Sequence, residues 1–361
     1  MAQLGAGPGA AGAGDREAHM KSEKWHAGEA SVSLSLPDYW FRRGVTRRDF
    51  LRFCGTMAAV LGLPPSFTGR IANALVSARR PALVWLHFQD CTGDSESFLR
   101  SSNPSAAEVI LDILSLDYHE TLMAPAGHQA EKSLRDTLKA NRGNYLAVVE
   151  GSLPAKDGGV YCLVGGRTAL EIAKEVCGQA AATIAAGSCA AFGGLPAAKP
   201  NPTGAVGVQE ALPGIRVINL PGCPMNGVNL AATLVHFLTF GALPATDQFH
   251  RPFFIHSDRI HEKCERRSHF EAQEFVLSWG DEGHAKGWCL YLMGCKGPET
   301  WMNCPTVRWN DGTSWPVLAG HGCIGCAQPH FWDRMTPFYT KLARLRRTGD
   351  ILPEEFPRKP Q

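Results

Sequence analysis

The sequence predicts an α/β protein, with a doubly wound parallel sheet covered by helices on both faces and a loop-rich second domain. Short apolar runs, each about the length of one strand, alternate with stretches of helical periodicity, which is typical of a parallel sheet. The expected strands are 82–88, 144–149, 181–186 and 215–220, and the expected helices are 106–116, 130–140, 168–177 and 228–240. The alternation stops near residue 250, so we place the sheet domain at 81–248 and the second domain at 249–340.

The totals of the chain agree with this division and exclude other classes of protein. Its 361 residues allow two modest domains, and a hydrophobic content of 44% can supply a core. A net charge of +2 gives no sign of a nucleic-acid partner. No run of about 18 apolar residues occurs, so we expect no transmembrane helix.

The first 80 residues differ from the rest of the chain. Residues 1–45 begin with a Gly- and Ala-rich stretch and are expected to be a disordered leader. In 46–80, the pair Arg47-Arg48 precedes a short apolar run that leads to the small-x-small sequence Ala72-Asn73-Ala74. This layout is typical of a twin-arginine export signal. The alternative is a basic amphipathic helix that the mature protein keeps.

Three of the twelve cysteines directly follow expected strands. They are Cys91, Cys189 and Cys223, and each has a glycine within two residues. Because the carboxyl ends of parallel strands share one edge of a sheet, we expect these thiols to converge there. Asp94 lies where the next helix would begin, and N–H groups at such a start can stabilise a negatively charged cluster.

The second domain carries seven further candidate ligands. They are His261, Cys264, Cys289, Cys295, Cys304, Cys323 and Cys326. Bound metal would help so irregular a segment to fold. Zinc is one candidate, but zinc ribbons usually pair two CxxC motifs and this chain has one, so iron–sulfur clusters suit the spacing better. Cys54, Cys162 and Cys177 are expected not to be ligands.

Six motifs, in order along the chain, resemble the small subunit of nickel–iron hydrogenases. They are DCTGDSESF (90–98), GSCAAFGG (187–194), PGCP (221–224), RIHEKCERRSHF (259–270), CLYLMGCKGPETWMNCP (289–305) and GHGCIGC (320–326). The resemblance implies a flavodoxin-like first domain and a second domain with further clusters. It also implies three clusters that carry electrons from H2 oxidation at a nickel–iron centre, which belongs to a separate large subunit.

The resemblance further implies a ligand set for each cluster. The proximal 4Fe–4S cluster would use Cys91, Asp94, Cys189 and Cys223. The medial cluster would use Cys304, Cys323 and Cys326, and Pro316 in place of a fourth cysteine favours a 3Fe–4S type. The distal 4Fe–4S cluster would use His261, Cys264, Cys289 and Cys295.

Asp94 is a departure, since the family usually has cysteine at this position. Either Asp94 binds iron through oxygen, or that iron takes water and Asp94 only forms a hydrogen bond. We favour direct ligation, because the spacing fits and an aspartate is ordinarily ionised at neutral pH. Some oxygen-tolerant members have two extra cysteines near this cluster, where this chain has Gly93 and Gly194. We hypothesise that Asp94 gives a different route to operation in air.

The resemblance implies a large subunit as partner, an external electron acceptor such as a cytochrome, and room for a dimer of heterodimers. Residues 341–361 are expected to be a polar tail without an anchor helix. A working export signal would place the protein in the periplasm or at a membrane, and otherwise it would be cytoplasmic. The alternatives are an iron–sulfur subunit of another redox complex and a zinc-stabilised binding module.

Overall fold

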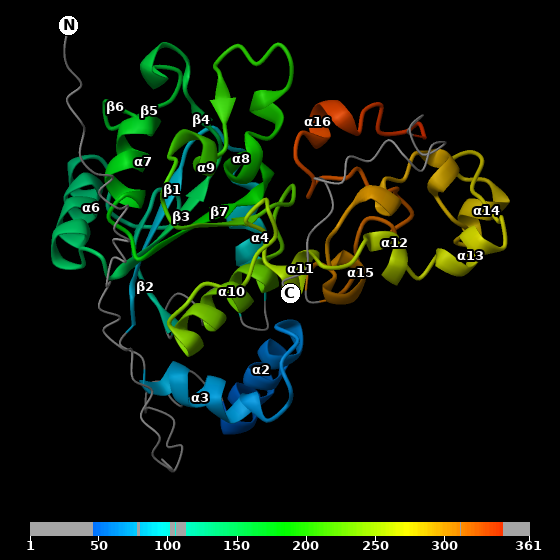
Figure 1. The fold of residues 1–361 in the computed structure, drawn as a ribbon, viewed down its shortest axis with the longest axis horizontal. Helices are drawn as coiled ribbons and strands as arrows, with labels where there is room; N and C mark the ends of the chain where they lie inside the picture. The colour runs from blue at the N-terminus through cyan, green and yellow to red at the C-terminus, as the bar shows by residue number, and fades with distance from the viewer. Residues whose placement is uncertain (1–45, 78–79, 102–104, 106–112, 311, 342–361) are drawn as a thin grey trace, which may run out of the picture.

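A computed structural model describes residues 46–77, 80–101, 105, 113–310 and 312–341 (Figure 1). The expected leader (1–45) lies outside these residues, as does the tail beyond Lys341. No helix among the described residues is long and apolar enough to cross a membrane.

The first domain is built on a sheet of five parallel strands (Figure 1). The strands are β1 (Ala82–His87), β2 (Ser115–His119), β3 (Tyr145–Glu150), β7 (Ala182–Ala186) and β9 (Val217–Leu220). Their order is β2-β1-β3-β7-β9, which is the flavodoxin-like order. The predicted doubly wound fold is therefore confirmed.

Helices cover both faces of this sheet. They are α4 (Gly93–Leu99), α6 (His128–Ala140), α7 (Ala169–Cys177), α8 (Gly187–Phe192), α9 (Val208–Ala211) and α10 (Gly227–Phe240). Along β3, Leu146 and Val148 pack with α4 and α10, whereas Ala147 and Val149 pack with α6 and α7. Successive residues of a strand point to opposite faces, so a continuous apolar run marks a strand that is buried on both sides.

One predicted element is wrong in part. We expected a helix over 106–116, but Ser115 and Leu116 begin strand β2, and 106–112 lie outside the described residues. Strand β2 reads SLDYH and pairs only with β1, at the edge of the sheet. Its first three residues keep contact with solvent, so it lacks the apolar run that revealed the other strands.

The first domain also contains short strand pairs and 3-10 turns outside the main sheet. They are the antiparallel pairs β4 (Leu153–Pro154) with β8 (Ala205–Val206) and β5 (Leu163–Val164) with β6 (Arg167–Thr168), and the 3-10 turns 156–159 and 195–197.

The arginine-pair region folds into two helices, α2 (Arg47–Val60) and α3 (Phe67–Ser77), that lie beside α10 (Figure 1). Thr46 caps α2 by accepting a hydrogen bond from the Asp49 N–H. Phe50 and Met57 are buried in the same core as one face of the sheet. Arg47 and Arg48 stay exposed.

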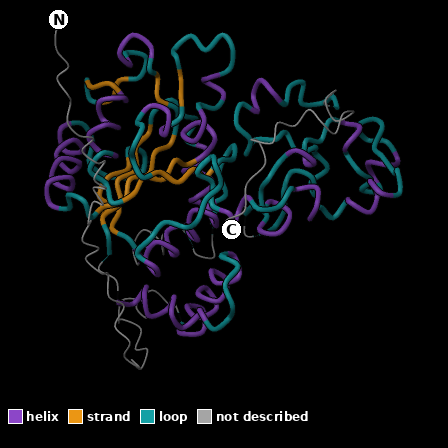
Figure 2. The backbone as a smooth tube through the Cα atoms, viewed as in Figure 1, coloured by secondary structure: helices purple, strands orange, loops and turns teal. Residues whose placement is uncertain are grey.

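The second domain lies beside the sheet domain and consists mainly of loops (Figure 2). Its helices are α11 (Phe253–His256), α12 (Ile260–Lys263), α13 (Arg267–Glu271), α14 (Glu282–Ala285), α15 (Cys304–Val307) and α16 (Phe331–Arg334), with 3-10 turns at 291–293 and 297–299. The predicted loop-rich character is confirmed. Apolar side chains are nevertheless present, because Ile255, Leu290 and Met302 continue the core of the first domain.

Candidate iron–sulfur sites

The carboxyl edge of the sheet brings the first candidate set together. Cys91 follows β1, Cys189 lies in α8 directly after β7, and Cys223 follows β9. Burial raises the pKa of the Cys189 thiol to about 12, and the nearby Cys223, Asp94 and Cys91 raise it further. Cys223 keeps contact with solvent, but partial desolvation still raises the pKa of its thiol to about 11, with added effects of Asp94 and Cys91. These mutual effects show that the three thiols lie close together, as the strand ends predicted, and that Asp94 lies beside them.

Two glycines leave room for these groups. At Gly187, where φ is +77°, a Cβ atom would lie 2.1 Å from Asp94 Oδ2. At Gly194, where φ is +61°, a Cβ atom would lie 2.3 Å from Cys189 Sγ. Both backbones have the conformation that glycine adopts freely. A side chain at either position would displace a candidate ligand.

Asp94 is buried at the start of α4. Its Oδ1 accepts a hydrogen bond of 2.5 Å from the Met225 N–H, and Oδ2 accepts none from the described residues. Burial, followed by the charge of Glu150, raises the pKa of Asp94 to about 8. Burial and Glu150 therefore disfavour the ionised form of Asp94 that the sequence predicted for neutral pH. A nearby cation would have to favour the charged form.

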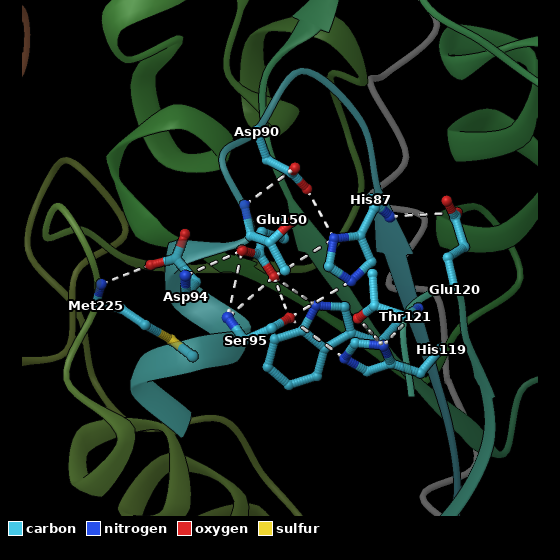
Figure 3. A network of polar contacts seen from close by, with 11 residues as sticks. His87, Asp90, Asp94, Ser95, His119, Glu120, Thr121, Glu150 and Met225 are labelled. Atoms are coloured by element: carbon cyan, nitrogen blue, oxygen red, sulfur yellow. Dashed lines mark hydrogen bonds and ion pairs between the residues drawn. The ribbon is translucent and has the colours of Figure 1, made fainter. Parts of the chain in front are cut away.

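Asp94 lies next to the carboxylate of Glu150, which the sequence did not predict as part of the site. Glu150 ends β3, is fully buried, and accepts hydrogen bonds from Asp94 N (2.9 Å), Ser95 N (3.1 Å) and Trp85 Nε1 (3.1 Å) (Figure 3). The Ser95 hydroxyl donates to it as well, at 2.5 Å. Glu150 thus fixes the first turn of α4, which carries Asp94. A carboxylate at the end of the apolar run YLAVVE was the available signal.

Two histidines, His87 and His119, extend this network (Figure 3). His87 Nδ1 lies 2.8 Å from Asp90 Oδ2 and 3.7 Å from Glu150 Oε2. Burial lowers the pKa of His87, but its partners Asp90 and Glu150 outweigh burial and leave the pKa raised. His119 Nε2 lies 3.3 Å from the Ser95 hydroxyl. Because the partners are already bonded to one another, we read the cluster as a hydrogen-bond network rather than a metal site.

The second domain forms a small cavity around the set proposed for the distal cluster. His261, Cys264, Cys289 and Cys295 all line it. Burial raises the pKa of Cys264 to about 12, although the Arg266 N–H donates to its sulfur at 3.4 Å. The ring of Phe270 packs edge-on against His261, with the centroids 4.6 Å apart. The predicted grouping of an imidazole with three thiols is present as one pocket.

Between these two sets lie Cys304, Cys323 and Cys326. Burial raises the pKa of Cys304 to about 12, and Cys323 raises it further. Burial also raises the pKa of Cys326 above its usual range, with a further effect of Cys304. Pro316 is exposed and adds no donor atom to this group.

The three sets follow one another without a gap. The Ser188 hydroxyl, next to Cys189 of the first set, donates a hydrogen bond to the Cys326 carbonyl. The Cys323 N–H donates to the Cys295 sulfur of the distal set at 3.3 Å. Thiols with a half-buried imidazole, and glycines in place of side chains, suit iron–sulfur clusters. The donor sets therefore fit the clusters that the sequence suggested.

The other three cysteines lie elsewhere. Cys54 and Cys177 are buried in apolar cores, and Cys162 packs at the edge of one. All twelve cysteines are free thiols, so no disulfide competes for the candidate ligands.

The fold and these sets define a class of protein, an α/β chain with several sulfur-rich sites in series. Two family models match it. One describes the NADH ubiquinone oxidoreductase 20 Kd subunit and matches residues 91–237. The other describes the C-terminal part of the NiFe/NiFeSe hydrogenase small subunit and matches residues 256–339.

Comparisons with individual proteins indicate the same family as the family models. The chain is 50% identical to the periplasmic [NiFe] hydrogenase small subunit 1 of Nitratidesulfovibrio vulgaris, over 82% of this chain and 94% of that relative. It is 46% identical to the uptake hydrogenase small subunit of Azotobacter vinelandii, over 86% of this chain and 87% of that relative. A reduced, active Ni-Fe-Se hydrogenase from Desulfomicrobium baculatum superimposes with a TM-score of 0.69 at 33% identity, covering 73% of this chain and all of that one. The chain belongs to the family of nickel–iron hydrogenase small subunits.

Proposed function

We propose that this chain is the electron-transfer subunit of a heterodimeric nickel–iron hydrogenase. One observation carries the proposal: the three ligand sets lie in series from Cys91 at the sheet edge to His261 in the second domain. Bound clusters would supply one-electron centres along this line. The chain's own residues hold them, space them and exclude water.

The three ligand sets are assigned as the sequence suggested. The proximal 4Fe–4S cluster takes Cys91, Asp94, Cys189 and Cys223. The medial 3Fe–4S cluster takes Cys304, Cys323 and Cys326, and the distal 4Fe–4S cluster takes His261, Cys264, Cys289 and Cys295. The shared cavity of the distal set and the mutual pKa effects within the other two support this assignment.

Asp94 completes the proximal set through Oδ2. The Met225 N–H occupies Oδ1, whereas Oδ2 lies against Gly187 and is free for iron. An oxygen ligand is harder than a thiolate and changes the cluster's potential. This difference in potential is the proposed basis of a role for Asp94 in operation under oxygen, in a chain that has glycine at positions 93 and 194.

Replacement of Asp94 tests this role. We expect Asp94→Cys to change the proximal cluster's electron paramagnetic resonance (EPR) spectrum and to lower hydrogen oxidation in air relative to that under argon. Asp94→Asn keeps the size but weakens ligation. Parent-like spectra and oxygen response in Asp94→Cys would remove Asp94 from both roles.

The partners follow from the two ends of the series. Cys91 and Cys223 are exposed in the lone chain, which supports a large subunit seated over the proximal set with its own nickel–iron centre. At the other end His261 is half-buried, which suits an external acceptor such as a cytochrome. A dimer of heterodimers is compatible with this arrangement.

A purification tests the function itself. The tagged chain is isolated without oxygen from its native host, and hydrogen-dependent dye reduction is measured in the eluate. We expect activity, a larger nickel-containing partner, iron and acid-labile sulfide. Zinc without sulfide would support the binding-module alternative, and iron without activity or partner would support another redox complex.

Export by the twin-arginine route, and thus a periplasmic or membrane-associated site, is also proposed. The exposed Arg47-Arg48 pair at the start of α2 supports it. The double substitution Arg47→Lys with Arg48→Lys keeps both positive charges and should leave the complex in the cytoplasm. Fractionation with an unchanged distribution would contradict export.

A further inference from the structure

Lys296 carries a buried ammonium group that has no carboxylate partner among the described residues. The residue is 1% exposed, and its Nζ donates hydrogen bonds to the carbonyls of Pro337, at 3.2 Å, and Thr340. None of the ion pairs of the described chain includes it. Two carbonyl groups satisfy donors of the ammonium group but do not neutralise its charge. Buried charges are ordinarily paired with an opposite charge.

The other lysines of the described ranges lie in a different environment. Lys132, Lys263 and Lys286 each form an ion pair with a nearby carboxylate, and their side chains are more than half exposed. Water and salt screen an exposed charge even where it has no partner. Water does not reach Lys296, so its charge calls for an opposite charge within the protein.

The backbone of Lys296 joins the two outer ligand sets. Lys296 directly follows Cys295, a proposed distal ligand, and its N–H donates at 2.7 Å to the carbonyl of Cys323, a proposed medial ligand. The Thr300 hydroxyl donates to the Lys296 carbonyl at 2.7 Å and lies 3.7 Å from the Cys323 sulfur. Lys296 is therefore fixed at the point where the distal and medial sets meet.

The segment that binds the ammonium group packs against the same loop. At Gly294, a Cβ atom would lie 2.4 Å from the Phe338 carbonyl oxygen and 2.6 Å from the Thr340 nitrogen. Pro337 and Thr340, whose carbonyls accept from Nζ, thus belong to a segment that lies directly on the residue before Cys295. This packing holds Nζ at the loop that carries the ligands instead of in solvent.

We propose that the Lys296 ammonium group is the counter-charge of the distal and medial clusters and raises the reduction potential of both. This inference rests on the proposed function, since it needs clusters at Cys295 and Cys323. Clusters held by thiolates carry negative charge, and each becomes more negative when it takes up an electron. A positive charge in a poorly solvated site stabilises the reduced form more than the oxidised form. Lys296 would thus keep the outer part of the series easy to reduce.

Lys296→Gln tests the inference in the whole hydrogenase complex. The glutamine amide keeps hydrogen-bond donors for the backbone carbonyls but carries no charge. Redox titration followed by EPR gives the midpoint potentials of the medial 3Fe–4S and distal 4Fe–4S signals, and we expect both to fall. At a fixed potential the reduced-to-oxidised ratio of each cluster should fall severalfold, up to about tenfold, which corresponds to about 59 mV for a one-electron couple.

Two control variants separate the charge of Lys296 from its hydrogen bonds. Lys296→Arg keeps a positive charge and donors for the carbonyls, so both midpoints should stay at the parent values. Lys286→Gln removes an exposed charge of the same domain and should also leave them unchanged. Unshifted midpoints in Lys296→Gln, or an equal shift in either control, overturn the inference.

A second measurement applies if Lys296→Gln does not assemble. An electron cryomicroscopy structure of the unmodified complex should show no carboxylate oxygen of either subunit within about 4 Å of Lys296 Nζ. A carboxylate at that distance would itself supply the counter-charge and overturns the inference. By contrast, an unmodified complex without any 3Fe–4S signal contradicts the medial assignment in the proposed function.

Discussion

The sheet domain and the second domain are stabilised in different ways. Strands β1 and β3 are buried along their whole length, and their side chains fill cores on both faces. The second domain has helices of four or five residues, and Cys289, Cys304 and Cys323 occupy buried positions there. Burial of apolar area can hold the first domain without a cofactor, whereas the second domain places candidate ligands where another protein would place hydrocarbon.

Removal of iron should give the largest difference in stability between the two domains. In the chelated, reduced protein we expect amides of 253–335 to lose nearly all protection from hydrogen exchange, while those of β1, β3 and β7 keep theirs. The reason is that metal binding is coupled to folding where few regular elements exist. Hydrogen exchange followed by mass spectrometry measures both regions in one sample. Equal protection in both would show that the second domain folds without iron.

A buried ion pair at the junction should give the next largest effect. Arg251 is fully buried, its Nε donates to Asp247 at 2.8 Å, and its Nη1 donates to the Ala327 carbonyl beside Cys326 at 2.9 Å. Arg251→Met leaves a buried carboxylate unpaired, so we expect a loss of about 3–5 kcal/mol in the free energy of unfolding.

Urea denaturation followed by circular dichroism measures this loss. The exposed pair of Lys132 and Asp136 provides the control, because Lys132→Met should change stability by less than about 1 kcal/mol. Similar losses in the two variants would mean that the junction is solvated.

The same contrast explains what the sequence could predict. The sequence predicted four of the five strands of the parallel sheet, because a strand that is buried on both faces consists of consecutive apolar residues. The edge strand β2 was missed, since its polar residues carry no such signal. The convergence of Cys91, Cys189 and Cys223 followed from strand ends alone. His87 and Glu150, however, meet only through the register of β1 and β3, where they are direct partners.

The charge of Asp94 is a second property that the sequence alone could not predict. Position along the chain placed it correctly beside the cysteines. Its pKa depends on burial and on Glu150, which is 56 positions away in the chain. A pattern of residue types gives neither the depth of a side chain nor its distant neighbours.

The segment that forms helix α2 resembles an export signal, yet its side chains pack in the core of the sheet domain. Met57 is fully buried against one face of the sheet domain. Met57→Ala should lower the free energy of unfolding by about 2–4 kcal/mol in chains whose intact mass shows that 46–77 are present. Arg52→Ala, at an exposed position of the same helix, should change it by less than about 0.5 kcal/mol. Equal stability of both variants would show that α2 does not contribute to the core.

The smallest expected effect concerns acid, and it can be assigned to one buried histidine of the sheet domain. His119 is fully buried, 3.3 Å from the Ser95 hydroxyl, and its ring centroid lies 5.0 Å from that of Trp85. Burial, followed by the charge of His87, lowers the pKa of His119 from 6.5 to about 3. Between these values the unfolded chain binds a proton that the folded chain does not, so stability falls as the pH drops below 6.5. The slope from this one group is at most about 1.4 kcal/mol per pH unit.

His119→Gln removes the proton site and should flatten the dependence of the unfolding free energy on pH between 6.5 and 4. His128→Gln, at an exposed position of α6, should keep the parent slope. The two domains can be followed separately in this experiment through hydrogen exchange of peptides from each domain, measured by mass spectrometry. If the effect lies in the sheet, exchange of peptides from the second domain at low pH should be the same in parent and variant. A parent-like slope in His119→Gln would mean that another group controls the acid response.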